Sequence, residues 1–317
     1  MNIRNYYILS LLIVFFFSSF SGLNIELEKE KLIHNGRERI FLVHLPKNHD
    51  PSRSYPLVIA LHGGNGKAKR FNRSTNNRFN KLADEENFIV VYPQGIDKSW
   101  NDHKDRNSFG IARKENVDDV GFINKMIDHL IIKYNVNPQQ VFACGISNGG
   151  LMSATLAAKL PEKIQAIGMV SSNFSKVYLD DMISNSPAPF PIIIIHGTED
   201  PIFPYEEGYI TVFKKNRGDV IGVEKSISYM LTLNGNFSEG IETDLTNNDL
   251  FDHCSTQKIV YPNLENPHLK VELLKVFGGG HTWPGGHQYL PKKLIGRVTK
   301  DFNAADELWR FFKSTLE

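Results

Sequence analysis

The segment "QVFACGISNGGLMSATLAAKL", residues 140–160, decides the fold class. It begins with an apolar run that is typical of a buried strand and continues with the small and apolar residues of a helix. Ser147 lies at the junction, in the order Gly145-Ile-Ser-Asn-Gly149. A Gly-x-Ser-x-Gly pattern between a strand and a helix indicates a nucleophile elbow, a sharp turn that lifts a serine hydroxyl above the edge of a sheet.

The pattern is weakly specific by itself, because a chain with 24 glycines among 317 residues can match it by chance. The alternative is a serine that starts a helix beside glycines needed only for packing. The strand before Ser147 and the helix after it favour the elbow.

The segment 38–46 is expected to form an early strand, and short apolar runs follow it at 57–61, 88–92, 141–144, 164–170 and 191–196. Fully apolar runs of this length indicate strands buried on both faces, as in a parallel sheet. Apolar residues recur every three or four positions over 118–134 and 301–316, which predicts helices with one apolar face. The alternation predicts a single-domain α/β fold, a doubly wound and mostly parallel sheet with helices on both faces.

The N-terminus has the three-part pattern of a secretory signal. A basic residue precedes an apolar run over 6–17, and Ser19 and Ser21 then occupy the −3 and −1 positions. The run is short for a membrane span. We therefore predict a signal peptide over residues 1–21, an α/β domain over residues 22–317 and a secreted or periplasmic location. The alternative is an uncleaved anchor helix.

Composition limits the partners. The net charge of +1 gives no reason to expect nucleic acid or a stable membrane association. The 11 histidines are scattered, without an H-E-x-x-H motif or paired-cysteine spacing, so we expect no metal and no cofactor. Cys144 lies in an apolar strand, where it packs as a small hydrophobe, and we expect Cys144 and Cys254 to be free thiols. The oligomeric state stays open.

A serine nucleophile needs a histidine base and an orienting carboxylate, which follow it in this order in such folds: serine, acid, histidine. "GTEDPIFPYEEG" follows an apolar run and offers Asp200, with Glu199 as the neighbouring alternative. "KVELLKVFGGGHTWPGGH" ends a strand in three glycines and then offers His281, with His287 as its rival. Each residue alone could be a turn aspartate or a structural histidine. The order and the positions just past strand ends favour the catalytic set Ser147, Asp200 and His281.

An oxyanion hole needs two preorganised N–H donors. The backbone N–H of Asn148 is expected to be one. "LHGGNG" follows an early strand, and its glycines allow backbone to approach a ligand closely. We favour the N–H of Gly64 as the second donor, with Gly63 and Asn65 as alternatives. A phosphate-binding loop is the competing interpretation, but no lysine followed by serine or threonine is present.

Six segments together resemble one family: "LHGGNG", "DDVGFINKMIDHL", "GISNGG", "HGTEDPIFPY", "GGGHTWPGG" and "DFNAADELWRFF". The chain is similar, from about residue 35 to its end, to the polyhydroxybutyrate depolymerase family of α/β-hydrolases, which is allied to feruloyl and acetyl-xylan esterases. The resemblance implies a single-domain α/β-hydrolase and a secreted serine esterase that works through an acyl-enzyme. It assigns Ser147 as nucleophile, Asp200 as acid and His281 as base.

The chain also departs from that family. Members often carry a cysteine where "LTLNGN" has Asn236, so the resemblance implies a lost disulfide that leaves Cys254 without its usual partner. The segment 237–257 matches no pattern. Trp100 and Trp283 could line the acyl pocket or could equally be core or lid packing.

The substrate stays open between several esters. The sequence shows no separate polymer-binding module, which favours a small or oligomeric ester, or an ester linked to polysaccharide, at least as much as bulk polyester. Two other function classes remain: a serine peptidase on the same fold, and a binding protein that kept the fold without catalysis.

Overall fold

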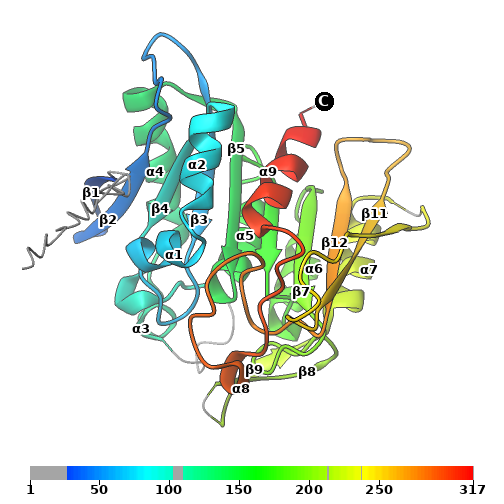
Figure 1. Ribbon diagram of the computed structural model, residues 1–317. Coiled ribbons are helices and arrows are strands. Elements are labelled where there is room, and N and C mark those ends of the chain that lie inside the picture. Colours follow the sequence, from blue (N-terminus) through cyan, green and yellow to red (C-terminus); the bar gives the residue numbers. More distant parts are fainter. Residues whose placement is uncertain (1–26, 103–109, 213, 237, 317) are drawn as a thin grey trace, which may run out of the picture.

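The computed structural model describes residues 27–102, 110–212, 214–236 and 238–316 (Figure 1). The predicted signal peptide over residues 1–21 lies outside the described residues. Within the described part, none of the helices is both long enough and apolar enough to cross a bilayer.

A ten-stranded sheet forms the centre of the molecule, in the order β1-β2-β4-β3-β5-β6-β7-β12-β11-β10. Its six central strands, from β4 to β12 in that order, pair in parallel, and the strands at both edges pair antiparallel. The strands are β1 (Glu28–His34), β2 (Arg37–His44), β3 (Tyr55–Leu61), β4 (Ile89–Pro93), β5 (Val136–Ile146), β6 (Ile164–Val170), β7 (Ile192–Gly197), β10 (Ile241–Asp244), β11 (Ser255–Tyr261) and β12 (Val271–Phe277). The predicted mostly parallel, doubly wound sheet is confirmed.

Helices cover both faces of this sheet (Figure 1). Leu57, Ile59 and Leu61 of β3 pack into one apolar cluster, and Val58 and Ala60 pack into the other, because successive side chains of a strand point to opposite faces. The first cluster includes side chains of α4 (Asp119–Tyr134), α5 (Asn148–Lys159), α6 (Lys176–Asn185) and α7 (Val223–Leu233). The second includes side chains of α1 (Ala68–Ser74), α2 (Arg78–Glu86) and α9 (Ala304–Ser314).

Short elements complete the fold at the sheet ends and edges. They are η1 (Ile96–Lys98), α3 (Ile111–Lys114), the hairpin β8 (Gly208–Val212) and β9 (Lys215–Val220), and α8 (Lys292–Ile295). The two predicted helices are present as α4 and α9. Asp118 caps α4 by accepting the N–H of Gly121 at 2.8 Å, which satisfies one of the donors that a helix start leaves open.

The segment that matched no pattern continues the sheet. Its residues form β10 and the first part of β11, which pair antiparallel beyond β12. Asn236 lies just before it and donates from its amide to the carbonyl of Tyr261 at 2.9 Å, so a hydrogen bond joins the chain after α7 to β11. Cys144 and Cys254 are buried free thiols, and burial raises the pKa of Cys254 to about 12.

Candidate active site

Ser147 lies at the sharp turn between β5 and α5. Its φ of 59° and ψ of −124° are unfavourable for a residue with a Cβ, so surrounding contacts must hold the turn. A Cβ on Gly145 would lie 2.5 Å from the carbonyl carbon of Gly149, and one on Gly149 would lie 2.4 Å from the oxygen of Leu61. Only glycine allows β5, α5 and the end of β3 to come this close. Ser147 is partly exposed, whereas its neighbours in the turn are buried.

Asp200 and His281 follow two adjacent parallel strands, β7 and β12, and their side chains meet. His281 Nδ1 lies 2.9 Å from Asp200 Oδ2. The other carboxylate oxygen, Oδ1, accepts the N–H groups of Ile202 and Phe203, both at 2.8 Å. The carboxylate is therefore fixed by backbone on one side and presents its second oxygen to the imidazole.

The two alternatives lie elsewhere. Glu199 is exposed and forms an ion pair with Arg297 at 2.8 Å, on the surface. His287 is exposed, and its backbone N–H donates to the carbonyl of Ser74. The structure thus brings Asp200 and His281 together and leaves Glu199 and His287 outside this contact.

His281 is held in place through its backbone and its ring. Its N–H donates to the carbonyl of Ile295 at 2.6 Å, and its carbonyl accepts the Tyr289 hydroxyl at 2.9 Å. The ring stacks on Phe203 with 5.8 Å between centroids. These contacts restrict the imidazole to one orientation beside Asp200.

A second histidine, His196, was missed because it ends an apolar run that reads as buried strand. Its Nε2 lies 2.9 Å from the carbonyl of Phe203 and 3.6 Å from Asp200 Oδ2. Burial lowers the pKa of His196, so the ring stays neutral and adds no charge beside the carboxylate at neutral pH.

The two predicted oxyanion donors lie next to each other. A Cβ on Gly64 would lie 3.9 Å from the Cβ of Asn148, and one on Gly63 would lie 3.4 Å from the Cβ of Ser147. The N–H of Asn148 belongs to the first turn of α5, where a helix leaves its donors unpaired, and the Ser147 side chain does not cap it. Among the described residues, the N–H of Gly64 donates to no backbone carbonyl. Both groups are therefore available to an anionic oxygen.

His62 holds the loop that carries Gly64. Its Nε2 accepts the N–H of Gly95 at 3.1 Å, so the ring proton must lie on Nδ1, which donates to the carbonyl of Gly63 at 2.8 Å. Burial lowers the pKa of His62 to about 4. The ring is thus neutral, in a defined tautomer, over the neutral pH range.

Lowering the pH is expected to reduce the free energy of unfolding, in part through His62. The folded pKa of about 4 lies below the unfolded value of 6.5, so between these values only the unfolded chain binds the proton. Stability is therefore lost as pH falls from 6.5 towards 4, by roughly 3 kcal/mol from this residue. Urea unfolding at several pH values measures the decline, and His62→Gln is expected to make it shallower. Equal slopes in both proteins would contradict the assignment.

The two tryptophans considered for the acyl pocket are both buried. Trp100 is 0% exposed, and its indole N–H donates to the carbonyl of His62 at 2.8 Å. Trp283 is 2% exposed and meets the rings of Phe71 and Phe79 edge-on. Neither indole has a face open to a ligand, so of the two interpretations the structure favours packing.

The sequence and the fold are similar to those of known esterases. A family model described as "Putative esterase" matches residues 34–203. "Putative esterase NocK" of Nocardia uniformis subsp. tsuyamanensis is 25% identical, over 86% of this chain and 78% of that protein. "Feruloyl esterase B" of Piromyces equi is 25% identical over 77% of this chain. The match covers 42% of the length of that esterase. An acetyl xylan esterase from Aspergillus awamori shares the fold, with a TM-score of 0.58 at 15% identity over 90% of this chain and 99% of that one.

Proposed function

We propose that this chain, which belongs to the esterase family and is a carboxylic ester hydrolase, acts through the catalytic triad Ser147, Asp200 and His281. The observation that most supports this triad is the 2.9 Å contact between His281 Nδ1 and Asp200 Oδ2. The two residues lie past the ends of β12 and β7, and Ser147 lies past the end of β5 in the same sheet. The three residues come from separate parts of the chain, and the contact between His281 and Asp200 matches the one that orients the base in such triads.

The proposed reaction proceeds through an acyl-enzyme. His281 Nε2 takes the proton of the Ser147 hydroxyl while Oγ attacks the ester carbonyl carbon. The carbonyl oxygen becomes an oxyanion, which the N–H groups of Gly64 and Asn148 stabilise. His281 then gives the proton to the departing alcohol. Water, activated by the same imidazole, attacks the acyl-enzyme and releases the acid.

Asp200 has two roles in the proposed mechanism. Because Oδ2 accepts from Nδ1–H, the unprotonated nitrogen of His281 is Nε2, the atom that must accept the serine proton. The negative charge also stabilises the imidazolium that forms during attack. Asp200 is thus an orienting and electrostatic group, and the proton is held by His281.

For the substrate, we propose a small or oligomeric ester, including the ester groups that decorate plant polysaccharide. The names of the relatives, feruloyl esterase and acetylxylan esterase, support this class. The resemblance to polyhydroxybutyrate depolymerases keeps oligomers of 3-hydroxybutyrate as a candidate.

A substrate panel tests the proposal. It compares p-nitrophenyl butyrate, methyl ferulate, acetylated xylan, 3-hydroxybutyrate oligomers and a peptide p-nitroanilide, with Ser147→Ala protein as the blank. We expect kcat/KM for at least one ester to exceed that for the anilide by about 100-fold or more, because esters have the better leaving group. Faster cleavage of the anilide would instead support a peptidase. Activity that survives in the blank would remove Ser147 from the mechanism.

Export is the remaining part of the proposal. The signal pattern over residues 1–21 supports a mature chain that begins near Gly22. N-terminal sequencing of protein collected outside the cytoplasm decides this, and a cell-retained chain that still begins with Met1 would contradict it.

A further inference from the structure

The segment 99–102, which follows η1, runs beside both oxyanion donors. Its residue Trp100 contacts Asn148, which carries one donor, and His62, which leads into the loop that carries the other. We propose that Trp100 is a positioning residue that sets the distance and angle between the N–H groups of Gly64 and Asn148. This inference rests on the proposed function of Ser147 and its oxyanion hole.

The first contact is between the backbone of Trp100 and the side chain of Asn148. The N–H of Trp100 donates to Asn148 Oδ1 at 2.8 Å, and Asn148 Nδ2 donates to the carbonyl of Trp100 at 3.1 Å. Nδ2 also donates to Asp102 Oδ2 at 2.8 Å. Three hydrogen bonds therefore hold the side chain of the residue whose N–H faces the oxyanion.

The second contact is between the indole and the loop after β3. Trp100 Nε1 donates to the carbonyl of His62 at 2.8 Å, and the two rings lie 4.9 Å apart between centroids. The same carbonyl would lie 2.6 Å from a Cβ on Gly149, so it also touches the elbow. The indole N–H thus fixes the peptide that precedes Gly63, directly against the turn that carries Ser147.

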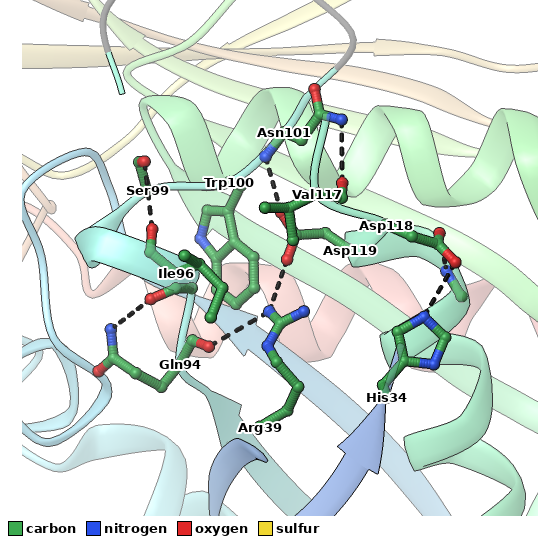
Figure 2. A network of polar contacts seen from close by, with 12 residues as sticks. His34, Arg39, Gln94, Ile96, Ser99, Trp100, Asn101, Val117, Asp118 and Asp119 are labelled. Atoms are coloured by element: carbon green, nitrogen blue, oxygen red, sulfur yellow. Dashed lines mark hydrogen bonds and ion pairs between the residues drawn. The ribbon is translucent and has the colours of Figure 1, made fainter. Parts of the chain in front are cut away.

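Buried ion pairs keep Trp100 itself from moving. The N–H of Asn101 donates to Asp119 Oδ2 at 2.8 Å, and Asp119 Oδ1 pairs with Arg39 at 2.5 Å (Figure 2). Asp102 pairs with Arg113, whose Nε donates to Oδ1 at 2.6 Å. Breaking a pair this deep leaves an uncompensated buried charge, so the two residues that follow Trp100 are held firmly, which agrees with a positioning role for Trp100.

The consequence concerns the transition state more than substrate binding. The two donors belong to different elements, α5 and the loop after β3, and they must both lie 2.7–3.1 Å from the developing oxyanion. Loss of the indole hydrogen bond frees the His62 carbonyl and lets the loop shift relative to α5. Because the ground-state carbonyl carries little charge, the shift lowers kcat and leaves KM nearly unchanged.

The test is Trp100→Phe, which keeps an aromatic ring and removes the N–H. We expect kcat for p-nitrophenyl butyrate to fall by about tenfold or more, with KM changed by less than about twofold. A trifluoromethyl ketone provides a second measurement. Ser147 Oγ adds to its carbonyl carbon, the serine proton passes to His281, and the oxygen becomes an oxyanion. Its affinity is expected to fall by a factor similar to that of kcat/KM.

Trp309→Phe is the matched control, because it shortens another buried indole, on α9, that stacks against Phe88 at 4.1 Å. Its kcat and its inhibitor affinity are expected to stay within about twofold of the parent protein. If Trp100→Phe does not fold, benzothienylalanine at position 100 replaces the N–H by sulfur at nearly constant shape, and the same losses are expected.

Three results would overturn the inference: a folded variant with kcat within about twofold of the parent, an equal loss in the Trp309 control, or a loss confined to KM. Each of these leaves the proposed function intact as long as Ser147→Ala protein is inactive. Turnover by Ser147→Ala protein would overturn the proposed function instead.

Discussion

Ser147→Ala is expected to lower kcat/KM for ester substrates by about 10³-fold or more, while the protein stays folded. The hydroxyl oxygen is the attacking atom in the proposed mechanism, and no other group of the described site replaces it. Alanine keeps the Cβ, so the strained turn at φ 59° changes little. The residual rate comes from the oxyanion donors and from substrate binding alone.

Ser153→Ala is the matched control for this prediction. Ser153 lies on α5, the helix that follows Ser147, and among the described residues its hydroxyl donates to the carbonyl of Gly149, four residues back, at 3.0 Å. Its removal is expected to leave turnover within about twofold, because such back-bonded hydroxyls contribute little to helix stability.

A chemical label gives an independent measurement. A p-nitrophenyl phosphonate is expected to lose p-nitrophenolate and to leave the phosphonyl group on Ser147, where peptide mass spectrometry finds it. Ser147→Ala protein should stay unlabelled and should melt within a few degrees of the parent. Near-normal turnover of this variant, or a label on another residue, would contradict the assignment of the nucleophile.

The elbow could be predicted because its physical requirements are local. Gly145 and Gly149 stand where a side chain would collide with backbone, so residue types alone mark the turn. The apolar runs of the central strands are equally local, since a strand covered on both faces has no polar positions. Asp200 and His281 could be predicted because strand ends of a parallel sheet meet at one edge.

The edge strands could not be predicted in the same way. All four residues of β10 are exposed, so no apolar run marks this strand. The beginning of the central strand β5 is hidden in the same way, because residues 137–140, which precede its apolar run, are partly exposed or exposed. Such strands exist because a neighbouring strand supplies hydrogen bonds, and that partner is not visible in their own sequence.

The supports of the site were missed for a related reason. Trp100 meets His62 and Asn148 across separations of 38 and 48 residues, and His196 reads as the end of a buried strand. No spacing rule connects residues so far apart in the sequence. A tryptophan in a loop is therefore equally consistent with a residue that lines a pocket and with a residue that packs in the core. The contact itself, and with it the positioning role, becomes visible only when the elements are placed in space.

Asp200→Asn is expected to reduce kcat by about 10³- to 10⁴-fold without unfolding the protein. Oδ1 of Asp200 accepts two backbone N–H groups, from Ile202 and Phe203, and an amide keeps these bonds only if its oxygen takes that side. The amide NH₂ then faces His281 Nδ1 and donates to it. The ring proton must then move to Nε2, so the nitrogen that takes the serine proton in the proposed mechanism can no longer accept one.

The opposite orientation of the amide is unfavourable, because it would place an NH₂ group against the two backbone N–H donors and leave both donors unpaired in a buried site.

Glu199→Gln is the matched control. The carboxylate of Glu199 pairs with Arg297 at the surface, and an exposed ion pair contributes little to stability. Its kcat is expected to stay within about twofold of the parent value. Steady-state kinetics of both variants with one ester, together with thermal melting, separate lost catalysis from lost folding. A crippled Glu199→Gln enzyme beside an active Asp200→Asn enzyme would show that the orienting acid is Glu199, which the contact between Asp200 and His281 argues against.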